Sequence, residues 1–310
     1  MSASEAGATG MLPARVILPL VLCTLIWGST WTAIRYQLGV VDHSWSIAYR
    51  FGLAALTMYV LARRNGAPIM VRRQDLMLVT AVAVMQFLLN FVCIYAAEGH
   101  ITSGLVAMIF SLLIVPNALF GWLFMGLKVS RSFIIGTVLA VAGMALLFHP
   151  QLGDVGGGDG HILLGVALTL GAVFSASVGN LLQATKRAGA MHWATLLLWA
   201  MGLAALFNAL LAFALTGPPQ WDPRPSYWIA TVYLGLLGTA LSFPVYLMVI
   251  RLIGPARAAY SGIIIPIVAM GFSTILEGYR WTPEAIAGAM LAVIGLYFAL
   301  SARKPARKSG

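Results

Sequence analysis

Apolar residues run almost without interruption along this chain of 310 residues, and short polar segments divide them into ten stretches. Each stretch is close to the roughly 20 residues that an α-helix needs to cross a hydrocarbon core of about 30 Å. The pattern predicts membrane-spanning helices at residues 14–36, 44–62, 75–97, 102–125, 132–149, 161–185, 192–216, 227–250, 255–277 and 283–302. We therefore expect an all-α polytopic membrane protein with no room for a soluble domain.

The positions of the basic residues predict how these ten helices are oriented. If the N-terminus lies in the cytoplasm, 15 of the 19 Lys and Arg residues fall in cytoplasmic segments, as the positive-inside rule requires. The remaining four are Arg35, Arg50, Arg224 and Arg280. The sequence thus predicts that both termini are cytoplasmic. The net charge of +10 is explained by this distribution, so we expect no nucleic-acid partner.

Two similar blocks of sequence divide the chain into halves. The block Gly136–Leu146, "GTVLAVAGMAL", and the block Gly288–Phe298, "GAMLAVIGLYF", share Gly, Leu, Ala, Val and Gly at the same spacing, 152 residues apart. We predict two five-helix repeats, and five crossings are an odd number, so the second repeat is inverted in the membrane. The predicted organisation is an N-terminal tail at 1–13, repeats at 14–149 and 161–302, an external linker at 150–160 and a basic C-terminal tail at 303–310.

Small residues and prolines recur at corresponding places in the two repeats. The small residues share one helix face in each repeat, which predicts close helix packing rather than contact with a substrate; they are Gly136, Ala140 and Gly143, and Gly288, Ala292 and Gly295. Pro116 and Pro266 lie within spans, where each removes a backbone hydrogen bond. They are candidate hinges beside a transport site, and simple kinks that help packing are the alternative.

Uncharged polar and aromatic side chains within the spans are the candidate substrate-binding residues. They share helix faces, and at this depth they must face protein or water. The set comprises Trp27 and Trp31, Gln86 and Asn90, Asn180, and Ser242 and Tyr246, with Thr169, Gln183 and Thr239 on the same faces. A shared cavity is one interpretation, and hydrogen bonds that hold helices together are the other.

Arg50 is the one basic residue set some way into a predicted span. It could bind a substrate carboxylate through its planar guanidinium group. It could equally pair with Glu98 or Glu277, which both fall at predicted external helix ends. No carboxylate or His is expected at mid-membrane, which predicts transport without an obligatory proton.

Other classes of protein fit the sequence less well. The five His residues show no metal-ligand spacing, and neither a nucleotide-binding loop nor a membrane-embedded carboxylate pair is present, so we expect no enzyme, cofactor or metal site. A carrier of sugar phosphates or nucleotides would need several deep cations, and an exporter of cationic drugs would need a buried acid.

Several segments resemble the EamA family of the drug/metabolite transporter superfamily across about residues 16–302. They are "WGSTWTAIR" from Trp27, "YRFGLAAL" from Tyr49, and the block "PIVAMGFSTILEGYRWTPEAIAGAMLAVIG" from Pro266. The first repeat departs from the family pattern, because Leu127 and Lys128 stand where the family has Glu-Arg. Within the family, the chain is most similar to the YddG-type exporters of aromatic amino acids.

The resemblance implies a ten-helix basket in a bacterial inner membrane, with a central cavity built from both halves. The implied function is a secondary transporter that exports small organic solutes, namely aromatic or neutral amino acids and related metabolites, by alternating access. A sugar-phosphate or nucleotide carrier and a drug exporter of the same superfamily are the alternatives. The expected partners are a small-molecule substrate and the lipid bilayer, with no obligatory protein partner.

Overall fold

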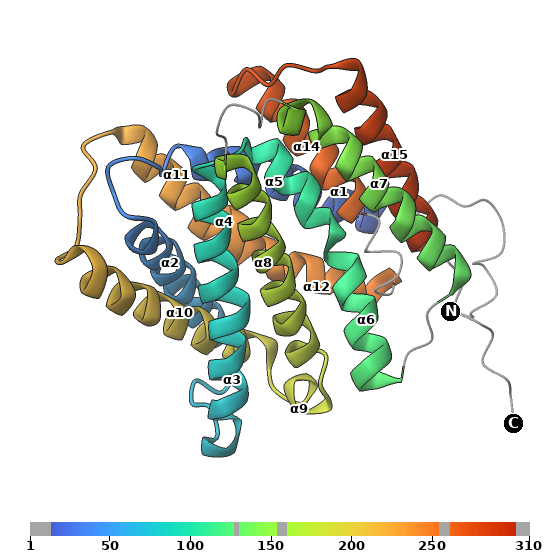
Figure 1. The fold of residues 1–310 in the computed structure, drawn as a ribbon. Coiled ribbons are helices and arrows are strands. Elements are labelled where there is room, and N and C mark those ends of the chain that lie inside the picture. The colour runs from blue at the N-terminus through green and yellow to red at the C-terminus, as the bar shows by residue number, and fades with distance from the viewer. Residues whose placement is uncertain (1–13, 127–129, 154–159, 254–260, 302–310) are drawn as a thin grey trace, which may run out of the picture.

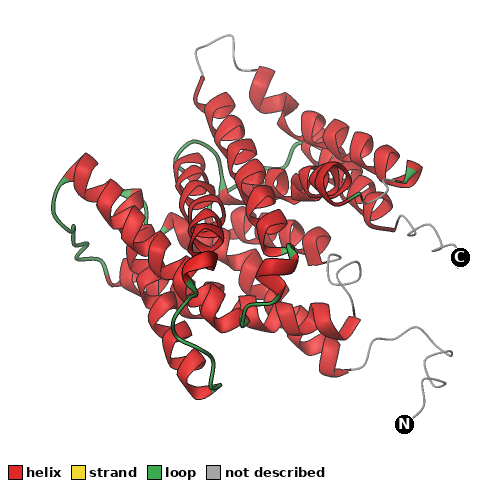
Figure 2. Ribbon diagram, turned by 90° about the horizontal axis from the view of Figure 1, so that it is seen from below, coloured by secondary structure: helices red, strands yellow, loops and turns green. Residues whose placement is uncertain are grey.

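The computed structural model describes residues 14–126, 130–153, 160–253 and 261–301, and all secondary structure in these ranges is helical (Figures 1 and 2). In the first half the elements are α1 (Ala14–Arg35), α2 (His43–Arg64), η1 (Arg73–Asp75), α3 (Leu76–Val82), η2 (Ala83–Leu89), α4 (Asn90–Glu98), α5 (Ser103–Phe110), η3 (Ser111–Leu113), α6 (Ile114–Met125) and α7 (Arg131–Gly153). In the second half they are α8 (Gly160–Gln183), α9 (Lys186–Gly189), α10 (Trp193–Thr216), α11 (Pro225–Gly235), η5 (Leu236–Leu241), α12 (Ser242–Ile253), α14 (Ser261–Leu276) and α15 (Pro283–Ser301).

Apart from the short helix α9, these elements of the described ranges form ten helical spans, because three spans are built from consecutive pieces: η1 to α4, α5 to α6, and α11 to α12. In the described ranges, six helical segments are long and apolar enough to cross a membrane, and three shorter apolar helices accompany them. The predicted all-helical membrane protein is confirmed. Helix α7 continues to Gly153, past the predicted end at 149. Linker residues 154–159 and the predicted tails at 1–13 and 303–310 lie outside the described ranges.

Local sequence signals set several helix ends. The Asp42 carboxylate accepts a hydrogen bond from the Ser44 amide at 2.8 Å and caps the start of α2. Pro225 stands in the first turn of α11, where its missing N–H and fixed φ suit a helix start. Gly126 ends α6 with φ +65°, a left-handed conformation that glycine adopts without steric penalty.

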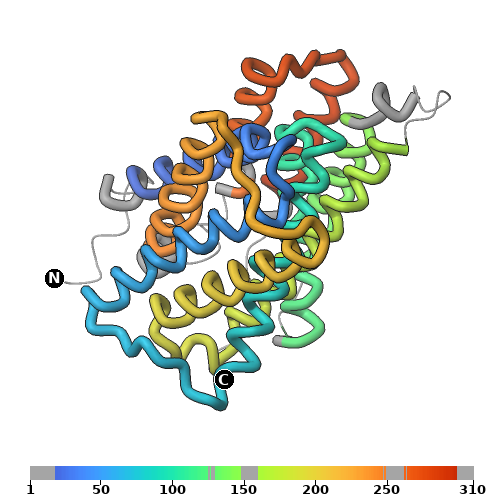
Figure 3. Tube along the Cα trace, turned by 90° about the vertical axis from the view of Figure 1, so that its left-hand side faces the viewer, coloured from blue at the N-terminus to red at the C-terminus, as the bar shows by residue number. Residues whose placement is uncertain are grey.

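The two halves interlock, because the most extensive contacts each join a helix of the first half to one of the second. These pairs are α7 with α15, α2 with α10, α4 with α8, and α1 with α14; α2 and α10 lie side by side in Figure 3. The same pairs of spans are in contact when each span is replaced by its counterpart in the other half. The contacts of α4 with α8 correspond to those of α12 with α1, and those of α1 with α14 to those of α8 with α6. Duplicated halves related by such an exchange bury each other's apolar faces.

Helices α7 and α15 approach so closely that their backbones touch through the small residues. A Cβ atom placed on Gly143 would lie 2.3 Å from the amide nitrogen of Ala292, and one on Gly288 would lie 2.4 Å from that of Leu147. Gly295 faces Ala140 and Gly136 at the same close range. All six small residues predicted to pack therefore lie along this one contact, at the side of the molecule marked by α7 and α15 in Figure 1.

The helical geometry changes at corresponding places in the third and eighth spans, and a further change lies directly before Pro116. The third span contains the π-helical segment η2, and the eighth contains the π-helical segment η5, 152 to 153 residues later. Pro116 lies in the first turn of α6, directly after the 3₁₀ segment η3. Pro266 lies inside α14, which is assigned as one unbroken α-helix. The matched irregularity is thus a pair of π-helical segments, a feature that often marks functional sites.

Candidate functional site

Arg50 is a buried cation that contacts neutral hydroxyl groups. Arg50 lies two turns into α2 and is only 3% exposed. Its Nε donates a hydrogen bond to Thr239 Oγ1 at 3.2 Å, and its Nη1 donates one to the Tyr95 hydroxyl at 3.5 Å. No carboxylate among the described residues lies within 4 Å of its guanidinium nitrogens. The predicted direct pairs of Arg50 with Glu98 or Glu277 are therefore not formed. A buried charge without a counterion is unfavourable, so this guanidinium is suited to accept an anionic group.

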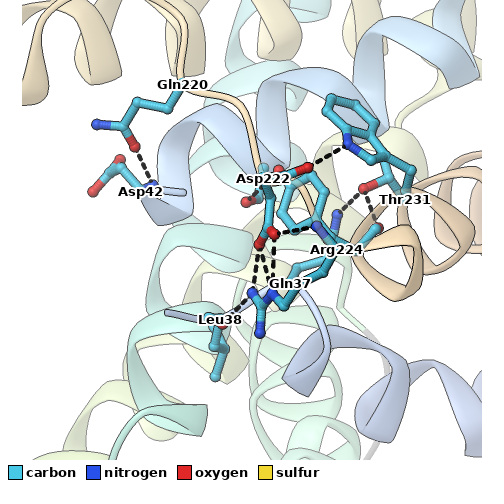
Figure 4. Close-up of polar contacts among 10 residues, drawn as sticks. Gln37, Leu38, Asp42, Gln220, Asp222, Arg224 and Thr231 are labelled. Carbon is cyan, nitrogen blue, oxygen red and sulfur yellow. Dashed lines mark hydrogen bonds and ion pairs between the residues drawn. The ribbon is translucent and has the colours of Figure 1, made fainter. Parts of the chain in front are cut away.

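A chain of neutral hydrogen bonds continues from Arg50 across the molecule. The Tyr95 hydroxyl donates to Gln37 Oε1 at 2.6 Å, and Gln37 Nε2 donates to Thr231 Oγ1 at 2.7 Å. Figure 4 shows Gln37 and Thr231 at the meeting point of the end of α1 and the side of α11. Because each partner is held by the next, the hydroxyl groups around Arg50 are fixed in position before any ligand arrives.

Aromatic rings form a continuous row that starts at Arg50. The guanidinium carbon lies 4.6 Å from the centroid of the Phe91 ring, within the range of a cation–π contact. The row then passes through successive edge-to-face contacts with centroid separations of 4.8 to 5.8 Å, in the order Phe91, Phe51, Phe87, Phe243 and Trp27, and ends at Tyr246, 4.9 Å from Trp27. It joins side chains of α1, α2, η2, α4 and α12 from both halves.

The two predicted tryptophans point to different neighbours. Trp27 Nε1 donates to the carbonyl oxygen of Gly238 at 3.2 Å, so its polar atom is satisfied by the backbone of η5. Trp31 instead lies against Phe110 of α5, with ring centroids 5.2 Å apart. Trp27 therefore belongs to the aromatic row with Tyr246, and Trp31 lies in a separate contact.

Gln86 and Asn90 are buried between the third span and α8. Asn90 Nδ2 donates to the Gln86 carbonyl at 3.1 Å, and Gln86 lies against Gly179, where a Cβ atom would meet its Oε1 at 2.4 Å. Gln86 Oε1 and Asn90 Oδ1 have no hydrogen-bond partner among the described residues. Asn180, next to Gly179, donates to Asn117 Oδ1 at 3.4 Å. These amides form a second polar group of the candidate site.

Ser242 and Thr239 shape the π-helical segment of the eighth span. Ser242 Oγ donates to the carbonyl of Leu237 at 2.6 Å, and Thr239 Oγ1 donates to that of Leu234 at 2.8 Å, each five residues earlier. Ser242 is therefore committed to its own helix, whereas Thr239 also accepts from Arg50.

The loop between α10 and α11 ties the predicted external end together (Figure 4). Arg224 Nη2 donates to the Leu38 carbonyl at 3.1 Å, and the Asp42 amide donates to Gln220 Oε1 at 2.6 Å. The side-chain hydrogen bonds from Arg224 hold the pKa of Asp222 below its ordinary value, and the same contact raises the pKa of Arg224. This loop restrains the segment that carries Gln37.

Several residues of the site escaped the sequence interpretation. Gln37 falls just beyond the predicted end of the first span, and its role depends on how the chain folds back. The face formed by Phe87, Phe91 and Tyr95 recurs every four residues and could have been recognised as an aromatic stripe. Among the described residues, no group of three or more His, Cys, Asp or Glu side chains could hold a metal ion.

Comparison with known proteins places the chain in a family. The family model described as the EamA-like transporter family matches residues 14–149 and 163–301. A protein named a probable terminal-alkyne amino-acid exporter from Streptantibioticus cattleyicolor is 26% identical, over 91% of this chain and 92% of that protein. A probable amino-acid metabolite efflux pump of Salmonella typhimurium is 24% identical over 94% and 97% of the two chains.

Two further comparisons cover most of the chain. The inner membrane transporter YedA of Escherichia coli K12 is 26% identical over 82% of this chain and 80% of its own length. A solved crystal structure aligns with a TM-score of 0.68 over 93% of this chain and 97% of that chain, at 16% identity, which shows a shared fold. With both halves matched, the chain is a multi-pass membrane protein that belongs to the EamA-like transporter family and is not an enzyme.

Proposed function

We propose that this protein is a secondary transporter that exports aromatic or neutral amino acids and related metabolites by alternating access through a site between its two halves. The observation that carries the proposal is Arg50, a buried guanidinium at the end of a row of aromatic rings, which no carboxylate of the described residues approaches within 4 Å. Such a site offers a cation for a substrate carboxylate and an apolar wall for its side chain.

Each part of an amino acid has a counterpart in the site. The carboxylate would bind Arg50, which keeps its fork in place through Thr239 and Tyr95. An aromatic or aliphatic side chain would lie along the rings between Phe91 and Trp27. The amide oxygens of Gln86 and Asn90, which have no hydrogen-bond partner among the described residues, are acceptors suited to an ammonium group. Trp31, Asn180 and Ser242 remain part of the proposed binding set.

Two relatives are named for amino acids, one as an exporter and one as an efflux pump, and these names support the same substrate class for this chain. The finer assignment to the YddG-type exporters of aromatic amino acids is part of the proposal and is supported by the aromatic row. We also propose a bacterial inner membrane location with both termini in the cytoplasm, on the basis of the distribution of basic residues.

The experiment is uptake by proteoliposomes that contain the purified protein. The panel comprises L-phenylalanine, L-tryptophan, L-leucine, L-glutamate, glucose 6-phosphate, uridine monophosphate and ethidium. Preference for the neutral amino acids is the expected result. Preference for the phosphates or for ethidium would replace the proposal with a sugar-phosphate or nucleotide carrier or with a drug exporter.

Variants test the role of the site itself. Arg50→Lys keeps the charge but loses the bidentate fork, so we expect at least about a tenfold loss of transport rate from a change of a few kcal/mol. Arg64→Lys, at the exposed end of the same helix, is the matched control. Trp27→Ala should lower transport while Trp27→Phe retains more of it. Normal phenylalanine uptake by Arg50→Lys and by Trp27→Ala would rule out this location of the site.

A further inference from the structure

Basic side chains gather on two loops at one end of the molecule, the end marked by α3 and α9 in Figure 1. One loop joins α2 to η1, and the other runs through α9 between α8 and α10. The exposed basic residues on or directly before these loops are Arg63, Arg64, Arg72, Arg73, Lys186 and Arg187. Asp75 is the one acidic residue in the sequence of the two loops, so this end carries a surplus of positive charge.

The two loops are bonded to each other, although they belong to different halves of the chain. Arg187 Nε donates to Asp75 Oδ1 at 2.7 Å, and Arg187 Nη2 donates to the Gln74 carbonyl. The Asp75 amide donates to the Arg72 carbonyl at 2.7 Å, which closes the turn that carries Arg72 and Arg73. The positive-inside rule explains the sign of the charge at this end, but it does not require that the two loops be joined.

The first loop is also bound to helix α10. Thr195 Oγ1 donates to the Pro68 carbonyl at 2.5 Å, and Trp199 Nε1 donates to the Ile69 carbonyl at 2.7 Å. These bonds hold the loop backbone before Arg72, as the contact with the second loop holds it after that residue. A ligand that binds here meets a backbone that is already in place, which lowers the entropy cost of binding.

The arginines of this loop face an open hollow with apolar side chains beside them in the sequence. Arg72, Arg73 and Gln74 line the hollow, which has a volume of about 600 Å³. In the described part of the chain, no carboxylate lies within 4 Å of a guanidinium nitrogen of Arg72 or Arg73. Met70 is 74% exposed and Met77 is 86% exposed. Met77 follows Arg73 by four residues at the start of the third span, so their side chains share about the same helix face.

We propose that this hollow binds the headgroup of an anionic phospholipid. The lipid phosphate accepts hydrogen bonds from Arg72 and Arg73, because planar guanidinium groups match the geometry of phosphate oxygens. The acyl chains lie along Met77 and the third span. Because η1 begins a membrane span, the hollow stands at the level of the lipid headgroups, in the cytoplasmic leaflet under the proposed orientation. This site is separate from the proposed transport site and does not depend on the transported solute.

Native mass spectrometry of the delipidated protein in a neutral detergent tests the proposal, with each lipid added at known concentrations. We expect cardiolipin and phosphatidylglycerol to bind, and phosphatidylcholine, which has no net charge, to bind much more weakly. Each basic residue near an anionic lipid contributes about 1 kcal/mol, or about fivefold in affinity. The double variant Arg72→Gln with Arg73→Gln should therefore bind phosphatidylglycerol roughly 25-fold more weakly than the wild type. Equal binding of the three lipids by the wild type would overturn the proposal.

A matched control separates a defined site from general attraction to a basic surface. Arg63→Gln with Arg64→Gln removes the same charge from the end of α2 but leaves the lining of the hollow unchanged. This variant should weaken phosphatidylglycerol binding by less than about fivefold, because its arginines do not contact the headgroup. An equal loss in the two double variants would mean that lipid is attracted to the whole basic end, and it would overturn the site.

A soluble phosphate distinguishes a lipid site from a site for free phosphates, and this measurement uses the wild type alone. Glycerol 3-phosphate reproduces the phosphate and glycerol of the headgroup but has no acyl chains. We expect it to leave bound phosphatidylglycerol in place when both are present at the same concentration. Displacement of most of the lipid under these conditions would assign the hollow to soluble phosphates and overturn the assignment to lipid.

Discussion

The contact between α7 and α15 makes a sharp prediction, because it is formed by backbone atoms. A Cβ atom on Gly143 would lie 2.3 Å from the Ala292 nitrogen, 2.6 Å from the Gly288 oxygen and 2.8 Å from the Ala292 Cα, whereas ordinary contact begins at 3.4 Å. Gly143→Ala must therefore push the two helices apart by about 1 Å, and a gap of that size forfeits about a quarter to a half of each dispersion contact. Since this is the most extensive contact between the halves, the loss is spread along both helices.

The expected size of the effect follows from overpacking in well-packed interiors. Such insertions cost about 1–3 kcal/mol. Each kcal/mol lowers the melting temperature of a domain of 150–250 residues by roughly 2–4 °C, so we expect a fall of about 2 °C for each kcal/mol in this longer chain. Thermal melting of the purified protein in detergent, followed by size-exclusion chromatography, measures the change. Ala140→Leu, at another buried position of the same face, should have a larger effect on folding.

Two further variants distinguish this reasoning from a general effect of adding methyl groups. Gly271→Ala places a Cβ atom where no atom lies within 4 Å in helix α14, so it should keep or raise the melting temperature because alanine favours helices. Adding Ala292→Gly to Gly143→Ala should not restore stability, because the clash is with the backbone at position 292. A Gly143→Ala variant as stable as the wild type, or rescue by Ala292→Gly, would refute the predicted packing.

Two other predictions concern the ends of the spans. Cysteines introduced at Gly157 and Gly66 should differ in labelling by an impermeant thiol reagent in intact cells, with only Gly157→Cys reacting; equal labelling would contradict the predicted orientation. Asp222→Asn should lower the melting temperature at neutral pH, because Arg224 lowers the pKa of Asp222 in the folded protein. This stabilisation is fully present at pH values above 3.8, the ordinary pKa of the side chain, and is lost as the pH falls through the lower pKa of Asp222 in the folded protein. The melting temperatures of the wild type and the variant should therefore converge in acid. Melting curves that stay separated at the lowest pH would count against this contact as the cause.

The spans and their packing faces could be read from the sequence because the signals are local. Runs of apolar residues, Asp42 before α2 and Pro225 at the start of α11 each act within a few residues of the boundary they set. The small residues of α7 and α15 recur at helical spacing, so their shared face was visible, although the sequence did not show that the two faces meet each other.

The candidate site was predictable only in part, because its contacts join distant parts of the chain. Arg50 stood out as a lone charge in an apolar span, but its partners Tyr95 and Thr239 lie 45 and 189 residues away. Glu98 was assigned to a helix end, and its complete burial depends on neighbours from other spans.

The π-helical segments were not predicted, since the periodicity of apolar residues does not show where a turn is closed by bonds to the fifth preceding residue. Pro116 and Pro266 predicted breaks in the fourth and ninth spans. A 3₁₀ segment lies directly before Pro116, Pro266 lies inside helix α14, and the two π-helical segments lie in the third and eighth spans. In η5, the side-chain hydroxyls of Thr239 and Ser242 bond carbonyls five residues earlier, and these bonds accompany the wider turn.

Thr239 connects this wider turn to the candidate site, which leads to a last prediction. Its hydroxyl donates to the Leu234 carbonyl at 2.8 Å and accepts from Arg50 Nε at 3.2 Å. Thr239→Val keeps the shape of the side chain but leaves the carbonyl and the guanidinium N–H without these partners, at about 1–3 kcal/mol for each buried group left unpaired. Thr239→Ser retains the hydroxyl and loses only a methyl group, so it should stay closer to the wild type. We expect the melting temperature and the rate of phenylalanine uptake to be highest in the wild type, lower in Thr239→Ser and lowest in Thr239→Val. If Thr239→Val equals Thr239→Ser in both measurements, the hydroxyl neither holds the π-helical turn nor positions Arg50.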